Sequence, residues 1–190
     1  MSIHVIGVDA YALLDGEAEK VPPGSDGLVF LPHLMVGERA PYWDEYLRGG
    51  ILGLGVYHTR AHIFRAVLEG VAYAMRYSIE AAREAGQPIK RTTLVDGGAR
   101  SPLWRQIIAD VTGLAMDYIP DAKGAPLGDA ILAGLGTGVI TDHTVIEEWL
   151  GEKVKTEPNP RQAALYDAYY DLYTSSLEAN KKIFEKMGEI

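Results

Sequence analysis

The chain has 190 residues and a net charge of −8, because 26 acidic side chains outnumber 18 basic ones. Its 47 % of hydrophobic and 23 % of charged residues are typical of soluble globular proteins, so the length predicts one domain or one large lobe. The acidic balance argues against a dedicated nucleic-acid binder, since such proteins need a basic surface. Cysteine is absent, which excludes disulfides and thiolate metal sites and favours a cytoplasmic location.

No segment predicts insertion into a membrane. The longest apolar stretch, residues 130–140, is about half as long as a membrane-spanning helix and is interrupted by Gly134, Gly136 and Gly138. Residues 1–20 lack the basic start and the long apolar segment of a secretion signal. We therefore expect no membrane contact.

The first part of the chain predicts a short helix, a turn and a strand. Residues 10–20 have helical character, and the turn-forming sequence PPGSDG follows at residues 22–27. The run LVFLP at residues 28–32 is short, apolar and ended by proline, which is typical of a buried strand. Residues 36–48 have no clean period, so we expect an ordered loop there.

A second apolar run leads into a long helix. Residues 50–56, with the sequence GILGLGV, predict a strand. Thr59 is the expected N-cap of a helix whose apolar residues recur three or four positions apart, and Gly86 and Pro88 end it. The repeated apolar positions predict that one face of this helix packs against the core.

The middle of the chain repeats the order of strand and helix. Residues 92–95 predict a strand, residues 97–98 a glycine turn, and Ser101 with Pro102 the N-cap and first position of a helix. A strand and a helix follow again within residues 116–135. This alternation favours an α/β fold whose sheet is at least partly parallel.

The C-terminal part predicts a short helix within residues 141–150, an extended piece at 153–156 and a long terminal helix at 160–187. Five apolar or aromatic residues form the expected buried stripe of the terminal helix: Leu165, Tyr169, Leu172, Tyr173 and Leu177. The eleven tyrosines predict several half-exposed rings with hydrated hydroxyl groups.

The sequence LVDGGARSPLWRQIIAD, residues 94–110, is the most informative local feature. A strand delivers two glycines to the start of a helix, where a ligand can approach the backbone and the first N–H groups of the helix are free. This geometry suits a nucleotide. Turns of this kind also occur for purely steric reasons, and the local sequence alone favours that simpler interpretation.

Other candidate residues predict structure rather than chemistry. His58 and His62 have the four-residue spacing of a metal pair, but no third ligand is evident. His33 is expected to be a hydrogen-bonded histidine at a strand end. Ser101 is better explained as a helix cap than as a nucleophile, because no G-x-S-x-G sequence surrounds it.

No acidic residue has the context of a general base. Asp44 and Glu45 lie in the loop after a Tyr-Trp pair, where solvation is the usual role of a carboxylate. Glu38 and Arg39 are expected to pair with each other or with neighbours. Asp96 directly precedes the two glycines and is expected to accept N–H bonds that orient the turn.

Several longer stretches carry a resemblance when taken together. Residues 41–76 read PYWDEYLRGGILGLGVYHTRAHIFRAVLEGVAYAMR, in which a glycine-flanked apolar run leads to His62 and Ile63 and then to residues 66–69. LVFLPHLMVGERAPYWD, DGGARSPLWRQIIADVTG and GAPLGDAILAG are also present. This combination closely resembles the C-terminal region of the FGGY carbohydrate kinases, and GERAP with GGARSPLWRQ resembles the xylulose kinase branch most.

The resemblance implies the fold of an actin-like ATPase, in which two lobes of the ribonuclease-H type close over MgATP and a sugar. Residues 1–190 are then a single C-terminal lobe of the α/β class, with a mixed sheet, flanking helices and a long C-terminal helix. The resemblance extends over about residues 21–150, and the terminal helix at 160–187 adds nothing specific.

The resemblance also assigns a cofactor site. The residues that would bind ATP are Gly97, Gly98, Ala99, Arg100 and Ser101, with the first three packing their backbone against adenine and ribose. Mg²⁺ would be held mainly through the phosphates and the other lobe, so neither a metal ligand nor a catalytic residue is expected here. Gly128 would permit close packing near this site, and Asp129 departs from the small residue that relatives often carry.

The function implied is that of the nucleotide-binding lobe of an ATP-dependent sugar kinase with a xylulose-like substrate. In the family, the catalytic aspartate, most sugar contacts and the first phosphate loop lie in the N-terminal lobe. The second phosphate-binding hairpin lies upstream of this sequence. No position here matches them, so the chain alone is expected to be inactive. The implied partners are the N-terminal kinase lobe, a sugar substrate and, through an exposed lobe interface, a second copy.

Three interpretations remain open at the level of sequence. The chain is a fragment of a longer enzyme, a naturally split kinase subunit, or a non-catalytic binding or interaction module with the same fold. Binding of adenine nucleotide favours the first two. The sequence does not identify the sugar, because the side chains that select it are expected in the other lobe.

Overall fold

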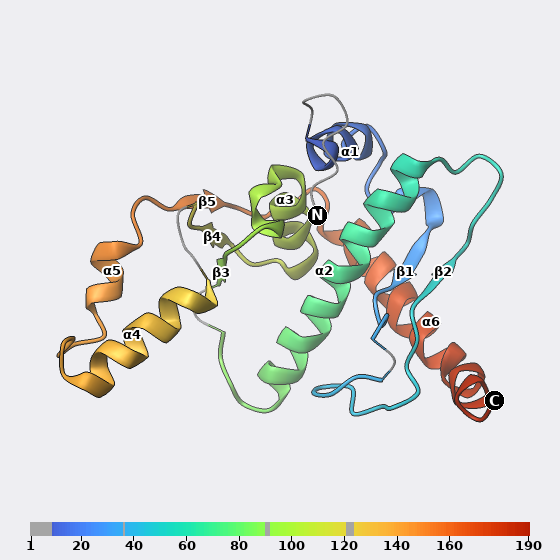
Figure 1. The fold of residues 1–190 in the computed structure, drawn as a ribbon. Helices are drawn as coiled ribbons and strands as arrows, with labels where there is room; N and C mark the ends of the chain where they lie inside the picture. Colours follow the sequence, from blue (N-terminus) through green and yellow to red (C-terminus); the bar gives the residue numbers. More distant parts are fainter. Residues whose placement is uncertain (1–8, 36, 90–91, 121–123) are drawn as a thin grey trace.

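The computed structural model describes residues 9–35, 37–89, 92–120 and 124–190. The first residue of the predicted loop at 36–48, Val36, lies outside the described residues. So do residues 1–8, which belong to the segment considered as a secretion signal. The elements are α1 (Ala10–Ala18), η1 (Ser25–Gly27), β1 (Val29–Leu31), β2 (Gly50–Leu52), α2 (Arg60–Glu84), β3 (Thr93–Leu94), η2 (Gly98–Arg100), α3 (Pro102–Thr112), β4 (Met116–Tyr118), α4 (Ala125–Thr137), α5 (Val145–Trp149), β5 (Val154–Thr156) and α6 (Ala163–Gly188) (Figure 1).

The described strands form two sheets. β1 and β2 pair antiparallel, with Phe30 opposite Ile51. β4 lies between β3 and β5, parallel to β3 and antiparallel to β5. The parallel pair of β3 and β4, joined through α3, confirms the strand–helix–strand unit predicted from residues 92–119.

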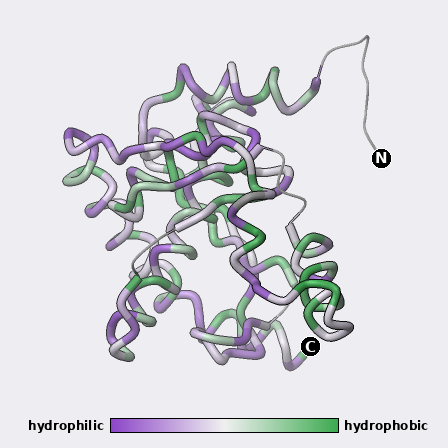
Figure 2. The backbone as a smooth tube through the Cα atoms, turned by 90° about the vertical axis from the view of Figure 1, so that its left-hand side faces the viewer, coloured by the Kyte–Doolittle hydropathy of each residue, from purple (hydrophilic) through white to green (hydrophobic). Residues whose placement is uncertain are grey.

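The long helix α2 crosses the centre of the molecule and packs against α1, α3, α6 and β1 (Figure 1). Figure 2 shows hydrophobic and hydrophilic residues alternating along the helices, the pattern of amphipathic helices with one buried face. Thr59 is the N-cap, as predicted, and its backbone N–H donates to Nδ1 of His62 at 3.2 Å. The helix ends before Gly86, which has a φ of +77°.

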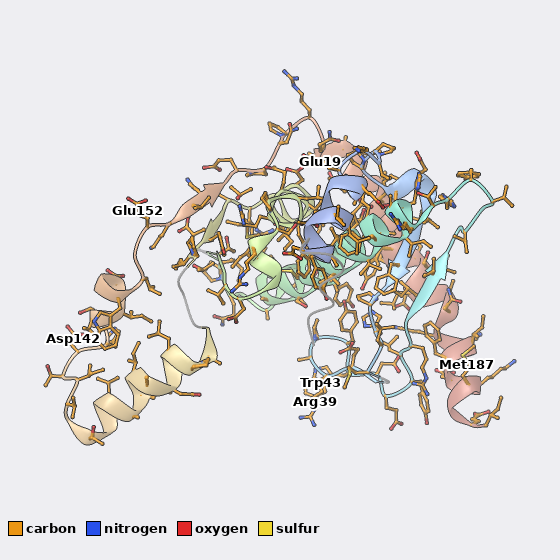
Figure 3. All side chains as sticks on the ribbon, turned by 45° about the horizontal axis from the view of Figure 1, so that its top comes forward. Glu19, Arg39, Trp43, Asp142, Glu152 and Met187 are labelled. Atoms are coloured by element: carbon orange, nitrogen blue, oxygen red, sulfur yellow. The ribbon has the colours of Figure 1, made fainter. Side chains whose placement is uncertain are left out.

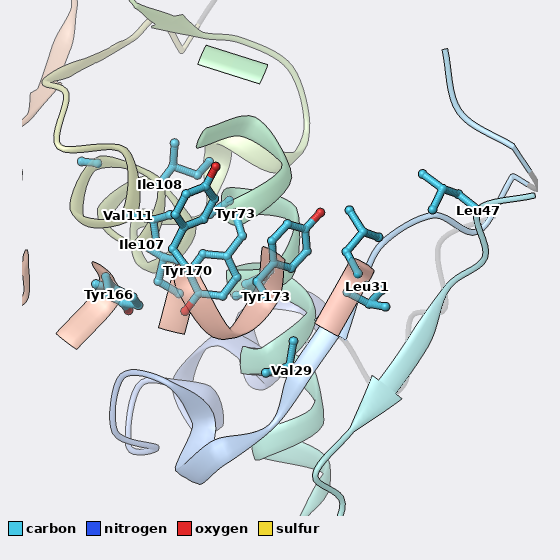
Figure 4. Packing of buried hydrophobic residues seen from close by; sticks show 14 of the residues in the cluster. Val29, Leu31, Leu47, Tyr73, Ile107, Ile108, Val111, Tyr166, Tyr170 and Tyr173 are labelled. Carbon is cyan, nitrogen blue, oxygen red and sulfur yellow. The ribbon is translucent and has the colours of Figure 1, made fainter. Parts of the chain in front are cut away.

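The core between α2, α3 and α6 is rich in tyrosine (Figure 4). The rings of Tyr73, Tyr166 and Tyr173 are no more than 2 % exposed. Burial raises the pKa of each of these three phenols. Several other tyrosines are partly exposed, as predicted, among them Tyr42, Tyr77 and Tyr169.

The predicted stripe of α6 is correct for only part of its length. Leu165 and Leu172 are exposed, whereas Tyr173 and Leu177 are buried. The buried residues of α6 are Tyr166, Tyr170, Tyr173, Leu177 and Phe184. Leu165 and Leu172 therefore lie outside the buried face of α6, which is formed mainly by tyrosines that pack into the core of the lobe.

Two further expectations need correction. The strand predicted at residues 50–56 ends at Leu52, since Gly53 has a φ of +81° and its backbone approaches the carbonyl of Gly27. Gly128 does not lie in a close-packed region, because a Cβ built on it would meet nothing within 4 Å. Helices α4 and α5 extend away from α2 as an arm beyond the sheet of β3, β4 and β5 (Figure 1).

Candidate functional site

The candidate site is the turn between β3 and α3. β3 ends at Leu94, and the short helix η2 follows at Gly98–Arg100. Ser101 caps α3, as predicted: its Oγ accepts a hydrogen bond from the backbone N–H of Trp104 at 3.0 Å, and Pro102 occupies the first position of the helix. The hydroxyl of Ser101 thus has a structural role in addition to any contact with a ligand.

The two glycines of the turn have different surroundings. A Cβ on Gly98 would overlap the ring of Trp104, and this indole is held in place because its Nε1 donates to the carbonyl of Leu68 on α2 at 3.1 Å. A Cβ on Gly97 would meet nothing within 4 Å, and its φ and ψ of −58° and −44° are open to any residue. Gly98 is therefore required by packing, whereas Gly97 faces open space.

The outer side of the turn offers backbone groups to a ligand. Gly97 and Gly98 are exposed, and within the described part of the chain their N–H groups have no hydrogen-bond partner. The side chain of Arg100 is also exposed, while Ala99 is buried. Gly97 has open space where a side chain would lie, so a ligand can approach the backbone closely. The exposed N–H groups can then donate to an anion or to polar atoms at the edge of a ring.

Asp96 does not have the role expected of it. Among the described residues its carboxylate accepts no N–H bond of the turn, and the residue has a φ of +69°. Its carboxylate instead lies against Gly124, just before α4, where a Cβ would overlap it. The start of α4 is therefore adjacent to the glycine turn, and the positive end of this helix favours a negative charge there.

Two histidines of the described residues, His33 and His58, have structural partners. His33 is buried, its Nδ1 lies 3.0 Å from Oε1 of Glu38 and its Nε2 lies 3.3 Å from the hydroxyl of Tyr173. Glu38 thus pairs with His33 rather than with Arg39. Nδ1 of His58 accepts from the backbone N–H of Gly55 at 2.8 Å.

No group of three or more His, Asp or Glu residues that could hold a metal ion is found in the part of the chain that the structure describes. No helix there is long and apolar enough to cross a membrane.

The loop at residues 37–48 packs against the C-terminal half of α2 and lies apart from the glycine turn. Arg39 and Trp43 are exposed at the end of this loop (Figure 3), and Trp43 has a φ of +48°. Tyr42, in the same loop, stacks on Tyr77 with ring centroids 4.6 Å apart, and burial raises its pKa to about 12. The loop is held by packing and brings no reactive group to the turn.

The sequence did not reveal the role of Glu69, which is 1 % exposed. Its carboxylate accepts hydrogen bonds from the N–H of Gly24 at 2.9 Å, the hydroxyl of Ser25 at 2.7 Å and Nε of Arg65 at 2.8 Å. These contacts fix the turn before β1 onto α2. The one signal in the sequence is an arginine and a glutamate four positions apart on an otherwise apolar helix face.

Known proteins resemble this chain over most of its length. A model of the FGGY family of carbohydrate kinases, C-terminal domain, matches residues 8–137. The xylulose kinase of Staphylococcus epidermidis is 35 % identical over 161 residues, which cover 84 % of this chain and 32 % of that protein. The gluconokinase of Bacillus subtilis is 35 % identical over 162 residues, which cover 85 % of this chain and 31 % of that protein.

A solved structure gives the same result. The crystal structure of xylulose kinase from Rhodospirillum rubrum matches with a TM-score of 0.78 at 33 % identity, over 95 % of this chain and 36 % of that chain. This likeness confirms the predicted fold class, an α/β lobe of the actin-like type with a mixed sheet and a long C-terminal helix. The chain spans about a third of the length of the curated relatives it matches.

Proposed function

Because the chain belongs to the FGGY family of carbohydrate kinases, through the C-terminal domain of that family, we propose that it is the nucleotide-binding lobe of an ATP-dependent sugar kinase. Residues 1–190 would form this single lobe. The observation that carries the proposal is the turn at 97–101, between a strand and a helix. There Gly97 has open space at the position of a side chain, and backbone N–H groups are exposed.

The residues of the turn fit an adenine nucleotide. The bare backbone at Gly97 leaves room for a flat ring or a ribose, and the exposed N–H groups of Gly97 and Gly98 can donate to its polar atoms. The exposed Arg100 adds a positive charge beside them. Bound ATP supplies the phosphoryl group of the reaction, and Mg²⁺ would be held through its phosphates and through groups of the other lobe.

The complete kinase requires a second lobe that carries the sugar and the catalytic base. In the proposal, this chain holds the nucleotide and closes on the sugar-bearing lobe, which excludes water and aligns the sugar hydroxyl with the phosphoryl group. Relatives named as xylulose kinase and gluconokinase support a sugar or sugar acid as substrate, with a xylulose-like sugar first. The absence of cysteine supports a cytoplasmic location for the enzyme.

The isolated 190-residue chain is then expected to transfer no phosphoryl group. A coupled ADP-release assay with ATP, Mg²⁺ and xylulose should give no rate above that of a blank without sugar. Sugar-dependent turnover by the purified chain would contradict the proposed division of roles between the lobes.

The replacement Gly97→Val tests the nucleotide site directly. The valine side chain enters space that is open in the free protein, so we expect an unchanged melting temperature and a dissociation constant for ADP that rises tenfold or more. Calorimetric titration with ADP and thermal unfolding measure the two quantities. Gly136→Ala, in the exposed part of α4, is the matched control and should leave ADP binding unchanged. Equal ADP affinity of Gly97→Val and wild type would contradict the site.

A further inference from the structure

A buried arginine lies behind the candidate nucleotide turn. Arg105 is in the first half of α3 and is 9 % exposed. Its Nη1 donates to the carbonyl of Ala99 at 2.6 Å and to the carbonyl of Arg100 at 3.2 Å. One nitrogen of the guanidinium therefore holds two successive carbonyl groups of the turn toward α3.

The same guanidinium connects the turn to the sheet. Its Cζ lies 4.5 Å from the ring centroid of Tyr118, which is a cation–π arrangement. Tyr118 is 9 % exposed and is paired with Leu94 of β3, the strand that leads into the turn. Arg105 thus connects the end of the turn to β4, the strand that pairs with β3.

The ion pairs that arginines make in the described part of the chain involve Arg60, Arg65 and Arg76 and not Arg105, whose buried Nε makes no hydrogen bond there either. Burying a charged group without an ion pair is costly, and two carbonyls and an aromatic face offset that cost only in part. A neutral side chain could fill the same volume without the free-energy cost of burying a charge. The arrangement leaves a positive charge just inside the turn, where it attracts an anion or an electron-rich ring on the outer side.

We propose that Arg105 is a positioning residue of the nucleotide site. It holds the carbonyls of Ala99 and Arg100 inward, which leaves the N–H groups of Gly97 and Gly98 on the outer side, and its charge favours an anionic ligand there. This inference rests on the proposed function, since the ligand it concerns is the adenine nucleotide.

Two replacements separate the shape of the side chain from its charge. Arg105→Met keeps most of the volume and removes both charge and donors, whereas Arg105→Lys keeps the charge and one donor group. Arg83→Met, on the exposed last turn of α2, is the matched control. The backbone amides of Arg100 and Ser101 donate within the turn, to the carbonyls of Gly97 and Gly98, so their hydrogen exchange measures how firmly the turn is held. Calorimetric titration with ADP at low and high salt measures the contribution of the charge.

In Arg105→Met we expect exchange in the turn to accelerate tenfold or more while exchange in α6 is unchanged. The dissociation constant for ADP should rise about tenfold and lose part of its salt dependence. Arg105→Lys should recover the salt dependence and part of the affinity, and it provides the test if the methionine variant does not fold. Arg83→Met should match wild type in both readouts.

Two results would overturn the inference. Unchanged exchange of the Arg100 and Ser101 amides in Arg105→Met would show that Arg105 does not hold the turn. Faster exchange with unchanged ADP affinity would show a purely structural residue. If the wild type bound no ADP, the proposed function would fail, while the exchange measurement would still decide whether Arg105 holds the turn.

Discussion

At the scale of single residues, one buried ion pair connects three parts of the lobe. Arg65 donates to Glu69 and also to the carbonyl of Ala18 at the end of α1 and to the hydroxyl of Tyr166 on α6. Glu69 in turn holds Ser25 before β1. Such a pair adds little net stability over a well-packed apolar pair, but removal of one partner leaves a buried charge without compensation.

The replacement Glu69→Ala should therefore be severe. We expect a loss of about 3 kcal/mol or more in the free energy of unfolding, because Arg65 would keep its charge in the core. Glu80→Ala is the control on the same helix: Glu80 pairs with Arg76 at the same spacing but is 37 % exposed. Glu80 also accepts from the hydroxyl of Tyr170 at 2.7 Å, so Glu80→Ala should lower the free energy of unfolding by about 1–2 kcal/mol, less than Glu69→Ala. Urea unfolding measures both, and equal losses would contradict this role of the buried pair.

At the scale of elements, the sequence predicted local features better than the contacts between elements. Thr59 and Ser101 were identified as caps because a cap depends on a few neighbouring residues. The face of α6 was partly wrong, because both leucine and tyrosine recur at helical spacing and only the partner helices decide which side is buried. The two glycines of the turn look alike in sequence. They differ only because the ring of Trp104 packs against Gly98 and not against Gly97. The contacts of Arg105 with the turn also depend on the fold and could not be predicted from the sequence.

A glycine in α2 shows a similar dependence on the fold. Gly70 faces β1, and a Cβ there would overlap the carbonyl oxygen of Phe30. Gly70→Ala should therefore lower the free energy of unfolding by about 1–3 kcal/mol, although alanine favours helix. Gly136→Ala in α4, with open space around it, should raise the free energy of unfolding by about 0.5–1 kcal/mol. Thermal unfolding checks the two signs, and a stabilising Gly70→Ala would contradict the close approach of α2 and β1.

At the scale of the whole molecule, the lobe carries apolar surface that its own described elements leave uncovered. Leu132 and Val139 on and after α4, Trp149 on α5 and Leu54 and Val56 after β2 are all exposed. The chain spans about a third of the length of its curated relatives. In the proposed kinase, the second lobe would cover part of this surface. The fold class and the family were predictable because they depend on long motifs, whereas no residue pattern of this chain identified the sugar.

The central claim is that adenine nucleotide binds at the turn of residues 97–101. The most direct test is a titration of the ¹⁵N-labelled 190-residue chain with ADP, followed through the backbone amide resonances. We expect saturable shifts concentrated at Gly97 to Ser101 and at the start of α4, and we expect them to be abolished in Gly97→Val. Shifts centred elsewhere, such as on the exposed loop around Trp43, or no shifts at millimolar ADP would contradict it.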